Sequence, residues 1–164
     1  MIIKDSMVVI HLAKMDLLEK CCKYFKQVII PKKVYEEIII CKDKNLEVKL
    51  IEDLVNKGKI IIKRIRNETL IKRAYQYNIQ RGEAECVALY WQEKADYLAS
   101  DDNNVRKKKF LLKINIIGTP VIILKLFRDK KINKDEYIRS LNILKKIGWF
   151  SNSIIDKLLM EVKK

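Results

Sequence analysis

The chain has 164 residues, of which 49% are hydrophobic and 34% charged, and its formal net charge is +14. This length and composition fit one globular domain over 1–164 with a hydrophobic core, and they exclude an intrinsically disordered chain. A strongly positive surface attracts polyanions, nucleic acid before anionic membrane, although a lysine-rich solubilising surface is the simpler alternative.

No apolar run approaches the roughly 20 residues that a membrane-spanning helix needs, and no signal-peptide cleavage site comes after the N-terminus. A cytoplasmic protein without a membrane partner is therefore expected. The cysteines Cys21, Cys22, Cys41 and Cys86 form no CxxC pair, and His11 is the only histidine. This set lacks the spacing of a zinc site, so buried, reduced thiols are expected.

Strands and helices are predicted to alternate along the chain. Short apolar or β-branched runs predict strands at 1–4, 27–30, 59–65, 96–100 and 116–117. Helical spacing of apolar residues predicts helices at 8–25 (broken near Met15), 32–42, 46–58, 68–78, 82–95, 103–115, 120–131, 133–148 and 151–164. Such alternation is typical of an α/β protein with a central, mostly parallel sheet and helices on both faces.

Individual residues mark the expected helix ends. Pro31 suits the first turn of the next helix, and Gly58 suits a helix C-terminus. Asn133 and Ser151 are expected as N-caps. The two helices after residue 133 exceed what a minimal domain of about 1–130 needs, and the junction between them, with Trp149 and Phe150, is interpreted as core or as a dimer or partner surface.

Carboxylates come directly after two of the predicted strands. Asp5 and then Ser6 come after the first strand, and Asp101 and Asp102 come after the strand at 96–100. Ligands of parallel sheets bind outside the carboxyl ends of the strands, so these acids would share one edge if the two strands are neighbours.

Further acids lie in nearby helices. Glu37 falls in the second turn of the helix after Pro31, and Glu83 and Glu85 fall in the first turn of the helix at 82–95, where helix capping is an alternative role. Clustered carboxylates repel one another unless a cation neutralises them, and Mg²⁺ or Mn²⁺ prefers such oxygen ligands. An acidic pocket in a basic protein suits the hydrolysis of phosphodiester bonds.

Four segments in order resemble the PIN-domain family of toxin-like ribonucleases and their stand-alone prokaryotic relatives. They are "IIKDSMVVIHLAKMDLLEK", "VIIPKKVYEEI", "RGEAECVALYW", and "LASDDNNVRKK" together with "NIIGTPVIILKLF". The resemblance implies a three-layer α/β/α sandwich and a metal-dependent endoribonuclease in which three or four acidic residues bind Mg²⁺ or Mn²⁺.

Carried over residue by residue, the resemblance implies the catalytic residues Asp5, Glu37, Glu83 and Asp102. It implies metal ligands at Asp5, Glu83 and Asp101 or Asp102, with Asp102 preferred, and Ser6 as a hydroxyl that supports a carboxylate. Arg106 would meet a phosphate, with an ion pair to Asp102 or a solvated position as alternatives. Lys4 departs from the family pattern, and it either pairs with Asp5 or points to the other face of the sheet.

The resemblance also implies partners. RNA would be the substrate, a homodimer would be the default assembly, and a toxin would be controlled by a small antitoxin protein bound in or across the active-site groove. Three other functions remain open. The first is an inactive PIN-like module that keeps the acidic pocket and acts as an RNA-binding or complex-forming subunit, and the second is a protein-interaction domain in which the carboxylates are structural. The third is a flap-type DNA nuclease, which usually has a longer chain and more acidic ligands.

Overall fold

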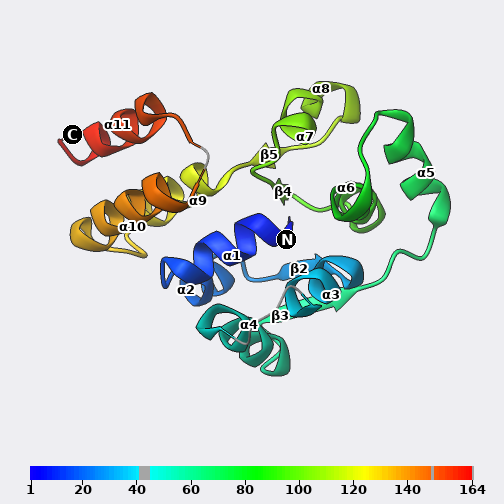
Figure 1. Cartoon of the computed structure of the whole chain (residues 1–164), viewed down its shortest axis with the longest axis horizontal. Coiled ribbons are helices and arrows are strands. Elements are labelled where there is room, and N and C mark those ends of the chain that lie inside the picture. Colours follow the sequence, from blue (N-terminus) through cyan, green and yellow to red (C-terminus); the bar gives the residue numbers. More distant parts are fainter. Residues whose placement is uncertain (41–44, 149, 164) are drawn as a thin grey trace.

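The computed structural model describes residues 1–40, 45–148 and 150–163. Five strands form one all-parallel sheet in the order β3-β2-β1-β4-β5 (Figure 1). They are β1 (Ile2–Lys4), β2 (Val28–Pro31), β3 (Ile60–Lys63), β4 (Tyr97–Ala99) and β5 (Ile116–Ile117). β1 and β2 are buried along their whole length, as expected of central strands rich in Ile and Val that are covered on both faces.

Helices alternate with these strands and carry most of the remaining core. They are α1 (Ser6–Lys14), α2 (Leu18–Tyr24), α3 (Lys32–Ile40), α4 (Leu46–Asn56), α5 (Glu68–Gln76), α6 (Arg81–Glu93), α7 (Asn103–Lys107), α8 (Lys109–Leu112), α9 (Thr119–Arg128), α10 (Lys134–Ile147), α11 (Asn152–Met160) and the 3₁₀ helix η1 (Glu161–Lys163). None of the described helices is long and apolar enough to cross a membrane.

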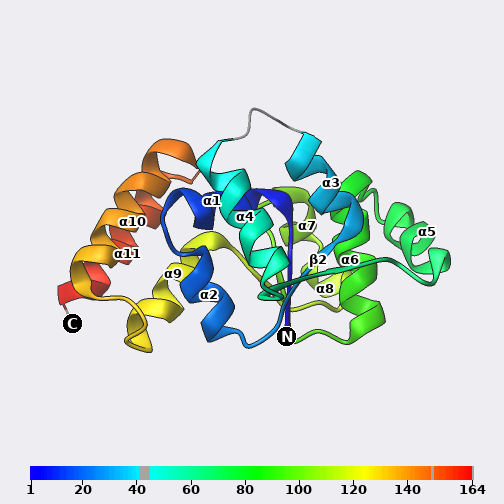
Figure 2. The ribbon, with the colours of Figure 1, turned by 90° about the horizontal axis from the view of Figure 1, so that it is seen from below.

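The helices form two layers around the sheet. Helices α3 and α6 cover one face, with α5 packed on α6, whereas α1, α2, α4 and α9 lie on the other (Figures 1 and 2). The structure thus confirms the predicted three-layer α/β/α sandwich. The carboxyl ends of the strands all point to one edge, which faces the viewer in Figure 1.

The last helices extend the layer that contains α9. Asn133 and Glu136 form a capping box at the start of α10, as predicted for Asn133. Tyr137 is fully buried, stacks on Phe127 of α9 with ring centroids 4.3 Å apart, and donates its hydroxyl to the Leu158 carbonyl at 2.9 Å. These contacts fix α10 and α11 against the core, on the left of Figure 1.

Two predicted helix boundaries were wrong. Pro31 closes β2 opposite Lys63, because a proline φ also suits extended backbone, and α3 begins one residue later. The predicted helix 103–115 is two short helices that meet at Lys108, and α8 ends at Lys113 in the left-handed region, which turns the chain back toward β5. Ser151 occupies the N-cap position of α11 as predicted, although its hydroxyl pairs with Ser153 at 3.0 Å and caps no backbone N–H.

Other expectations hold where the structure describes them. Gly58, at φ +67°, comes after the last residues of α4, and the helix pair predicted at 8–25 is broken after Met15. Cys21, Cys22 and Cys86 are buried and free. Cys41, Trp149 and the ends of the helices predicted at 32–42 and 151–164 lie outside the described residues.

Candidate active site

The site begins where the order of the strands reverses. β1 is flanked by β2 on one side and by β4 on the other, and Lys4 lies in register with Ala99. The Asp5 N–H donates to the Ala99 carbonyl at 3.1 Å, so Asp5 leaves β1 beside the chain that leaves β4 at Ser100. The two strands are neighbours, as a shared acidic edge requires, and this reversal point is where open α/β sheets bind ligands.

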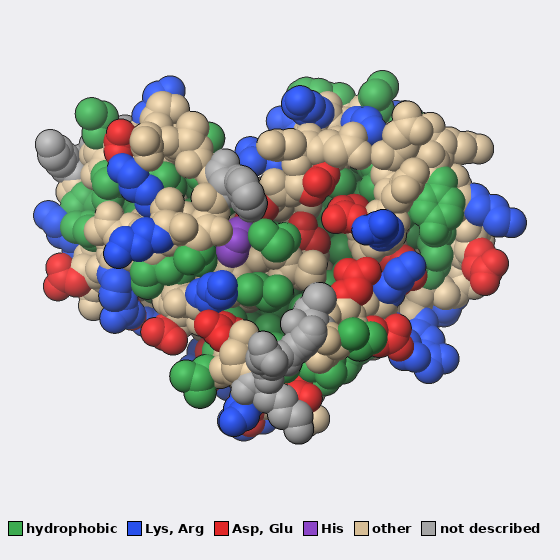
Figure 3. Space-filling view, viewed as in Figure 1, with side chains coloured by type: hydrophobic (Ala, Val, Ile, Leu, Met, Phe, Trp, Pro, Cys, Tyr) green, Lys and Arg blue, Asp and Glu red, His purple; other side chains and the backbone are tan. Residues whose placement is uncertain are grey.

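A pocket of about 510 Å³ opens at this edge of the sheet. Four carboxylates line it, and in Figure 3 acidic side chains gather in the hollow at the centre of the same face. The lining residues are Asp5, Ser6, Met7, His11, Glu83, Asp101, Asp102, Asn103, Arg106, Phe150, Ser151 and Ile154. The pocket therefore combines the turn after β1, the start of α6, the turn after β4 and the segment that leads into α11.

Asp5 is the most deeply buried of these acids. It caps α1, accepts the Val8 N–H at 2.8 Å, and accepts a hydrogen bond from the Ser100 side chain. Burial is the main cause that raises the pKa of the Asp5 carboxyl to about 7; the negative charges of Asp101 and Glu83 add to the rise, and the two hydrogen bonds offset only part of it. The protein thus holds Asp5 where a negative charge is poorly compensated.

Asp101 is held by the protein through both of its oxygens. Oδ1 accepts the Thr119 backbone N–H at 2.7 Å, and Oδ2 accepts the Thr119 hydroxyl at 2.5 Å. The His11 ring nitrogen Nδ1 lies 3.1 Å from Oδ2. Because these partners are buried, Asp101 fixes the turn between β5 and α9 to the end of β4 and to α1.

Asp102 has a different environment, although it is the next residue. Its Oδ1 caps α7 by accepting the Val105 N–H at 2.8 Å, and its own N–H donates to the Ser100 hydroxyl at 3.2 Å. Its second oxygen has no hydrogen-bond partner among the described residues. The two aspartates therefore differ. Both oxygens of Asp101 have hydrogen-bond partners, whereas one oxygen of Asp102 has none among the described residues and is available to a ligand in the pocket that Asp102 lines.

Glu83 and Glu37 approach from α6 and α3. Glu83 lines the pocket in the first turn of α6, and it contributes to the raised pKa of Asp5. Glu37 lies at the edge of this acidic group, where its Oε2 would be 2.9 Å from a Cβ placed on Gly82. Gly82 thus allows the carboxylate of Glu37 to approach the residue next to Glu83.

This close approach gives a test of Glu37. In a Gly82→Ala variant the new methyl group must push the Glu37 carboxylate aside, whereas alanine within α6 favours the helix by up to about 1 kcal/mol over glycine. We expect unchanged or increased thermal stability, and we expect the metal-dependent RNA cleavage that the family resemblance implies to be reduced about 10-fold or more. Full activity in the variant would show that the position of Glu37 does not matter.

The supporting residues lie beside these acids. Ser6 lines the pocket directly after Asp5. The Arg106 Nη1 atom would be 3.8 Å from a Cβ on Gly118, so its guanidinium lies at the rim of the pocket near Asp101. Within the described part of the chain it forms no ion pair with Asp102, which removes one of the two alternatives for Arg106 and leaves its charge available.

The structure decides between the two alternatives for Lys4, which were an ion pair with Asp5 and a position on the other face of the sheet. Its side chain is fully buried, donates from Nζ to the Cys21 thiol at 3.0 Å, and lies 5.3 Å from the centroid of the Phe25 ring. It therefore points to the α2 side of the sheet and does not neutralise Asp5.

Sequence reasoning missed several residues of the site. His11 and Thr119, which hold Asp101, and Ser100, which holds Asp5 and Asp102, were not singled out. The signal for Thr119 was present, because it comes after Gly118 in the turn that ends a strand. Ile154, which reaches the pocket from α11, had no local signal.

The donor set fits a hard divalent cation by its chemistry. Asp5, Glu83 and Asp102 offer only oxygen ligands, and a bound cation would offset the burial and the neighbouring negative charges that raise the pKa of Asp5. In the described residues no group of three or more His, Cys, Asp or Glu side chains is already arranged to hold a metal ion. Binding would therefore require the carboxylates of the pocket to turn toward a shared ion.

Comparison with known proteins places the chain in a family. A family model described as a PIN domain matches residues 1–164. PIN domains are generally nucleases and typically use divalent metals. No curated protein and no solved structure matched the chain. The five-stranded, all-parallel sheet between helical layers is consistent with the fold of that family. Because the family model covers the whole sequence, the chain belongs to the PIN-domain family.

Proposed function

We propose that the protein is a Mg²⁺- or Mn²⁺-dependent endoribonuclease that hydrolyses RNA phosphodiester bonds. The observation that carries the proposal is the pocket at the reversal point of the sheet. There Asp5, Glu83 and Asp102 converge from three separate elements on one cavity, and the burial of Asp5 leaves its negative charge only partly compensated by hydrogen bonds. The net charge of +14 supplies the attraction for a polyanionic substrate.

Asp5, Glu83 and Asp102 would hold the cation, and Glu37, which does not line the pocket but whose carboxylate approaches Gly82 beside Glu83, would support it. When bound, such a cation activates water and stabilises the charge on the departing oxygen of a phosphodiester. Asp101 would act as a positioning residue, because Thr119 and His11 already occupy its oxygens. Ser100 orients both Asp5 and the backbone of Asp102.

Arg106 would contact the substrate. Its guanidinium lies at the rim of the pocket, near the carboxylates but without an ion pair to Asp102 among the residues described. A guanidinium in this position matches the geometry of a phosphate and can offset the repulsion between RNA and the acidic pocket. A narrower proposal, that the enzyme is the toxin of a toxin–antitoxin pair and a homodimer, rests on the family resemblance.

The test is cleavage of single-stranded RNA. The purified protein, incubated with a 5′-labelled RNA, should cleave it in Mn²⁺ or Mg²⁺ and should leave it intact in EDTA. Asp5→Asn should reduce cleavage by about 100-fold or more, because several kcal/mol of transition-state stabilisation are lost with a cation ligand. Glu85→Gln, on the same helix as Glu83 but outside the pocket, serves as the control with normal activity.

Two outcomes would contradict this proposal. Cleavage that persists in Asp5→Asn would place the chemistry elsewhere. Absence of cleavage for every RNA tested, combined with tight RNA binding, would favour the inactive binding module. A DNA strand of the same sequence, tested in parallel, separates a ribonuclease from a DNA nuclease.

A further inference from the structure

A second groove adjoins the acidic pocket. Its volume is about 500 Å³, and it shares Asn103, Arg106 and Ile154 with that pocket. The residues that line it are Asn103, Arg106, Lys107, Lys109, Ile116, Gly118, Val121 and Ile154. No carboxylate is among these lining residues, so the charge of the lining changes from negative to positive between the two adjoining depressions.

The cations of this groove are available for a ligand. Arg106, Lys107 and Lys109 form no ion pair within the described residues, and both lysines are exposed. Some exposed lysines elsewhere pair with nearby acids, as Lys57 does with Asp53 at 2.7 Å, whereas Lys130 and Lys131, like the groove lysines, form no ion pair within the described residues. In Figure 3, lysine and arginine side chains lie over α7 and α8, above the acidic hollow. Unpaired cations beside an acidic pocket favour an anion that extends out of that pocket.

The floor of the groove is apolar. Ile116, Val121 and Ile154 contribute to it. Val121 is 40% exposed and Ile154 is 39% exposed. A ligand that places charges on the rim and a flat apolar group on the floor would satisfy both surfaces. A nucleotide has this combination, with a phosphate and a base.

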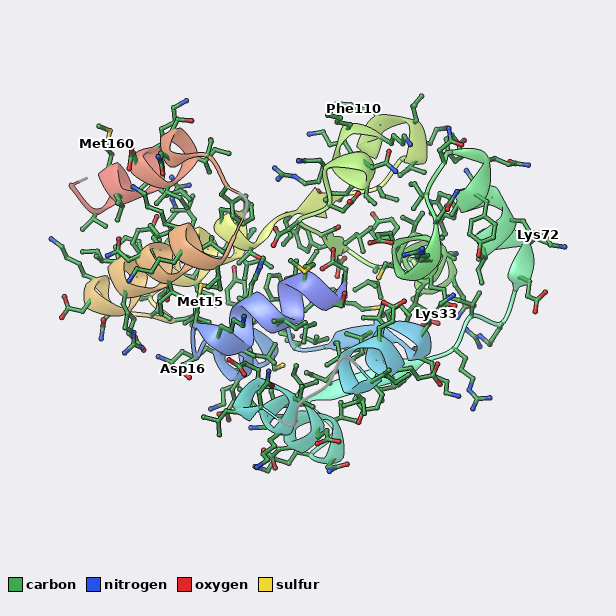
Figure 4. The ribbon with its side chains drawn as sticks, viewed as in Figure 1. Met15, Asp16, Lys33, Lys72, Phe110 and Met160 are labelled. Carbon is green, nitrogen blue, oxygen red and sulfur yellow. The ribbon has the colours of Figure 1, made fainter. Side chains whose placement is uncertain are left out.

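Phe110 adds an aromatic surface at the outer end of the groove. It is 81% exposed on α8, and the Nζ atom of Lys109, which lines the groove, lies 4.8 Å from the ring centroid. Figure 4 shows Phe110 at the outer edge of α8. A large exposed aromatic ring beside cations is the arrangement that single-stranded nucleic acid uses for stacking.

We propose that this groove binds the single-stranded RNA that flanks the scissile phosphate, and we call it the α7–α9 groove. The backbone would run from Arg106 past Lys107 and Lys109, with bases on the apolar floor and on Phe110. The inference rests on the proposed function, since it takes the acidic pocket as the place of cleavage. It assigns the direction in which the substrate strand leaves that pocket.

The test measures binding without turnover. Fluorescence anisotropy of a labelled 12-nucleotide RNA in EDTA compares the wild type with Lys107→Glu/Lys109→Glu and with Lys130→Glu/Lys131→Glu. The control pair is exposed at the opposite end of α9 and changes the net charge equally. We expect affinity to fall at least 10-fold for the groove pair and at most 3-fold for the control, with the slope of log affinity against log salt reduced by about 1 to 1.5 in the groove pair only.

Two further binding measurements test the contributions of Phe110 and of the apolar floor of the groove. Phe110→Ala should weaken binding about 5-fold or more, and a strand of equal length without bases should bind the wild type more weakly than RNA. Circular dichroism of every variant confirms that it is folded. Lys107→Ala/Lys109→Ala, a milder change, should show a smaller loss in the same direction.

Several results would overturn the assignment. Equal losses in the two lysine pairs would mean attraction by net charge alone. Full displacement of RNA by poly-glutamate at equal charge would show a site for acidic protein segments. These outcomes leave the nuclease proposal intact, because cleavage is measured separately with metal. Conversely, if RNA binding depends on the groove but the protein never cleaves RNA, the nuclease proposal is wrong and the groove stays assigned as an RNA-binding surface.

Discussion

Asp5→Asn is expected to increase the free energy of unfolding at pH 8 by about 2–4 kcal/mol in the absence of metal, and to reduce cleavage in the presence of metal by about 100-fold or more. The carboxyl of Asp5 has a pKa of about 7 in the folded protein, against 3.8 for an ordinary aspartate, chiefly because it is buried. Each pKa unit corresponds to about 1.4 kcal/mol. The asparagine side chain can still accept the Val8 N–H and carries no buried charge.

The same shift sets the pH dependence of the wild type. Because the pKa is higher in the folded than in the unfolded chain, the folded state binds more protons between about pH 4 and pH 7. The contribution of Asp5 to stability is therefore complete below pH 4 and is lost as the pH rises through 7. Urea unfolding at pH 5 and pH 8 should show the difference between wild type and Asp5→Asn mainly at pH 8.

An exposed aspartate provides the control. Asp53→Asn, on the surface of α4, should change stability by less than about 1 kcal/mol at either pH. A wild-type protein that is as stable as Asp5→Asn at pH 8 without metal would mean that Asp5 is not held under electrostatic stress, and a cation site would then lack its physical basis.

Substitution of the two adjacent aspartates is expected to lower the free energy of unfolding by different amounts. Asp101→Ala should lower the free energy of unfolding by about 3 kcal/mol, because the buried N–H and hydroxyl of Thr119 and the ring of His11 lose their acceptor. Asp102→Ala should cost only about 1 kcal/mol, the usual value of an N-cap.

The rate of cleavage should depend mainly on Asp102, whereas stability depends mainly on Asp101. Asp102→Ala is expected to reduce the rate by about 100-fold or more, whereas Asp102→Glu should retain part of it because a carboxylate remains. Thr119→Val should reproduce part of the stability loss of Asp101→Ala, since it removes one of the same hydrogen bonds. Chemical denaturation and RNA cleavage at a temperature where all variants are folded measure both quantities. Equal stability losses for Asp101→Ala and Asp102→Ala would contradict these roles.

Much of this architecture could be predicted from local sequence. Runs such as "MIIK" and "QVII" end at a polar or proline residue, and a parallel sheet brings the residues at the carboxyl ends of its strands to one edge. This is why Asp5 and the Asp101–Asp102 pair were expected to meet. The break between α7 and α8 was not predictable, because a lysine-rich stretch has no helix stop, and the Tyr77 carbonyl that accepts a hydrogen bond from Lys108 at this break is distant in sequence.

The different environments of Asp101 and Asp102 could not be predicted from the sequence either. Both residues come after the same strand, and only the three-dimensional approach of Thr119 and His11 shows which carboxylate is already satisfied. The same holds for Ile154, which reaches the pocket because α11 folds back over α9. Contacts of this kind depend on tertiary packing, which no local pattern encodes.

The most direct test of the central claim, that the carboxylates at the reversal point of the sheet form a cation site, is a calorimetric titration with Mn²⁺ at pH 8. The wild type and Glu85→Gln should show saturable binding, and Asp5→Asn and Asp102→Asn should lose it or weaken it at least 10-fold. A folded wild-type protein that binds no Mn²⁺, or binding that is unchanged in both aspartate variants, would contradict the claim and leave the acidic pocket without its proposed role.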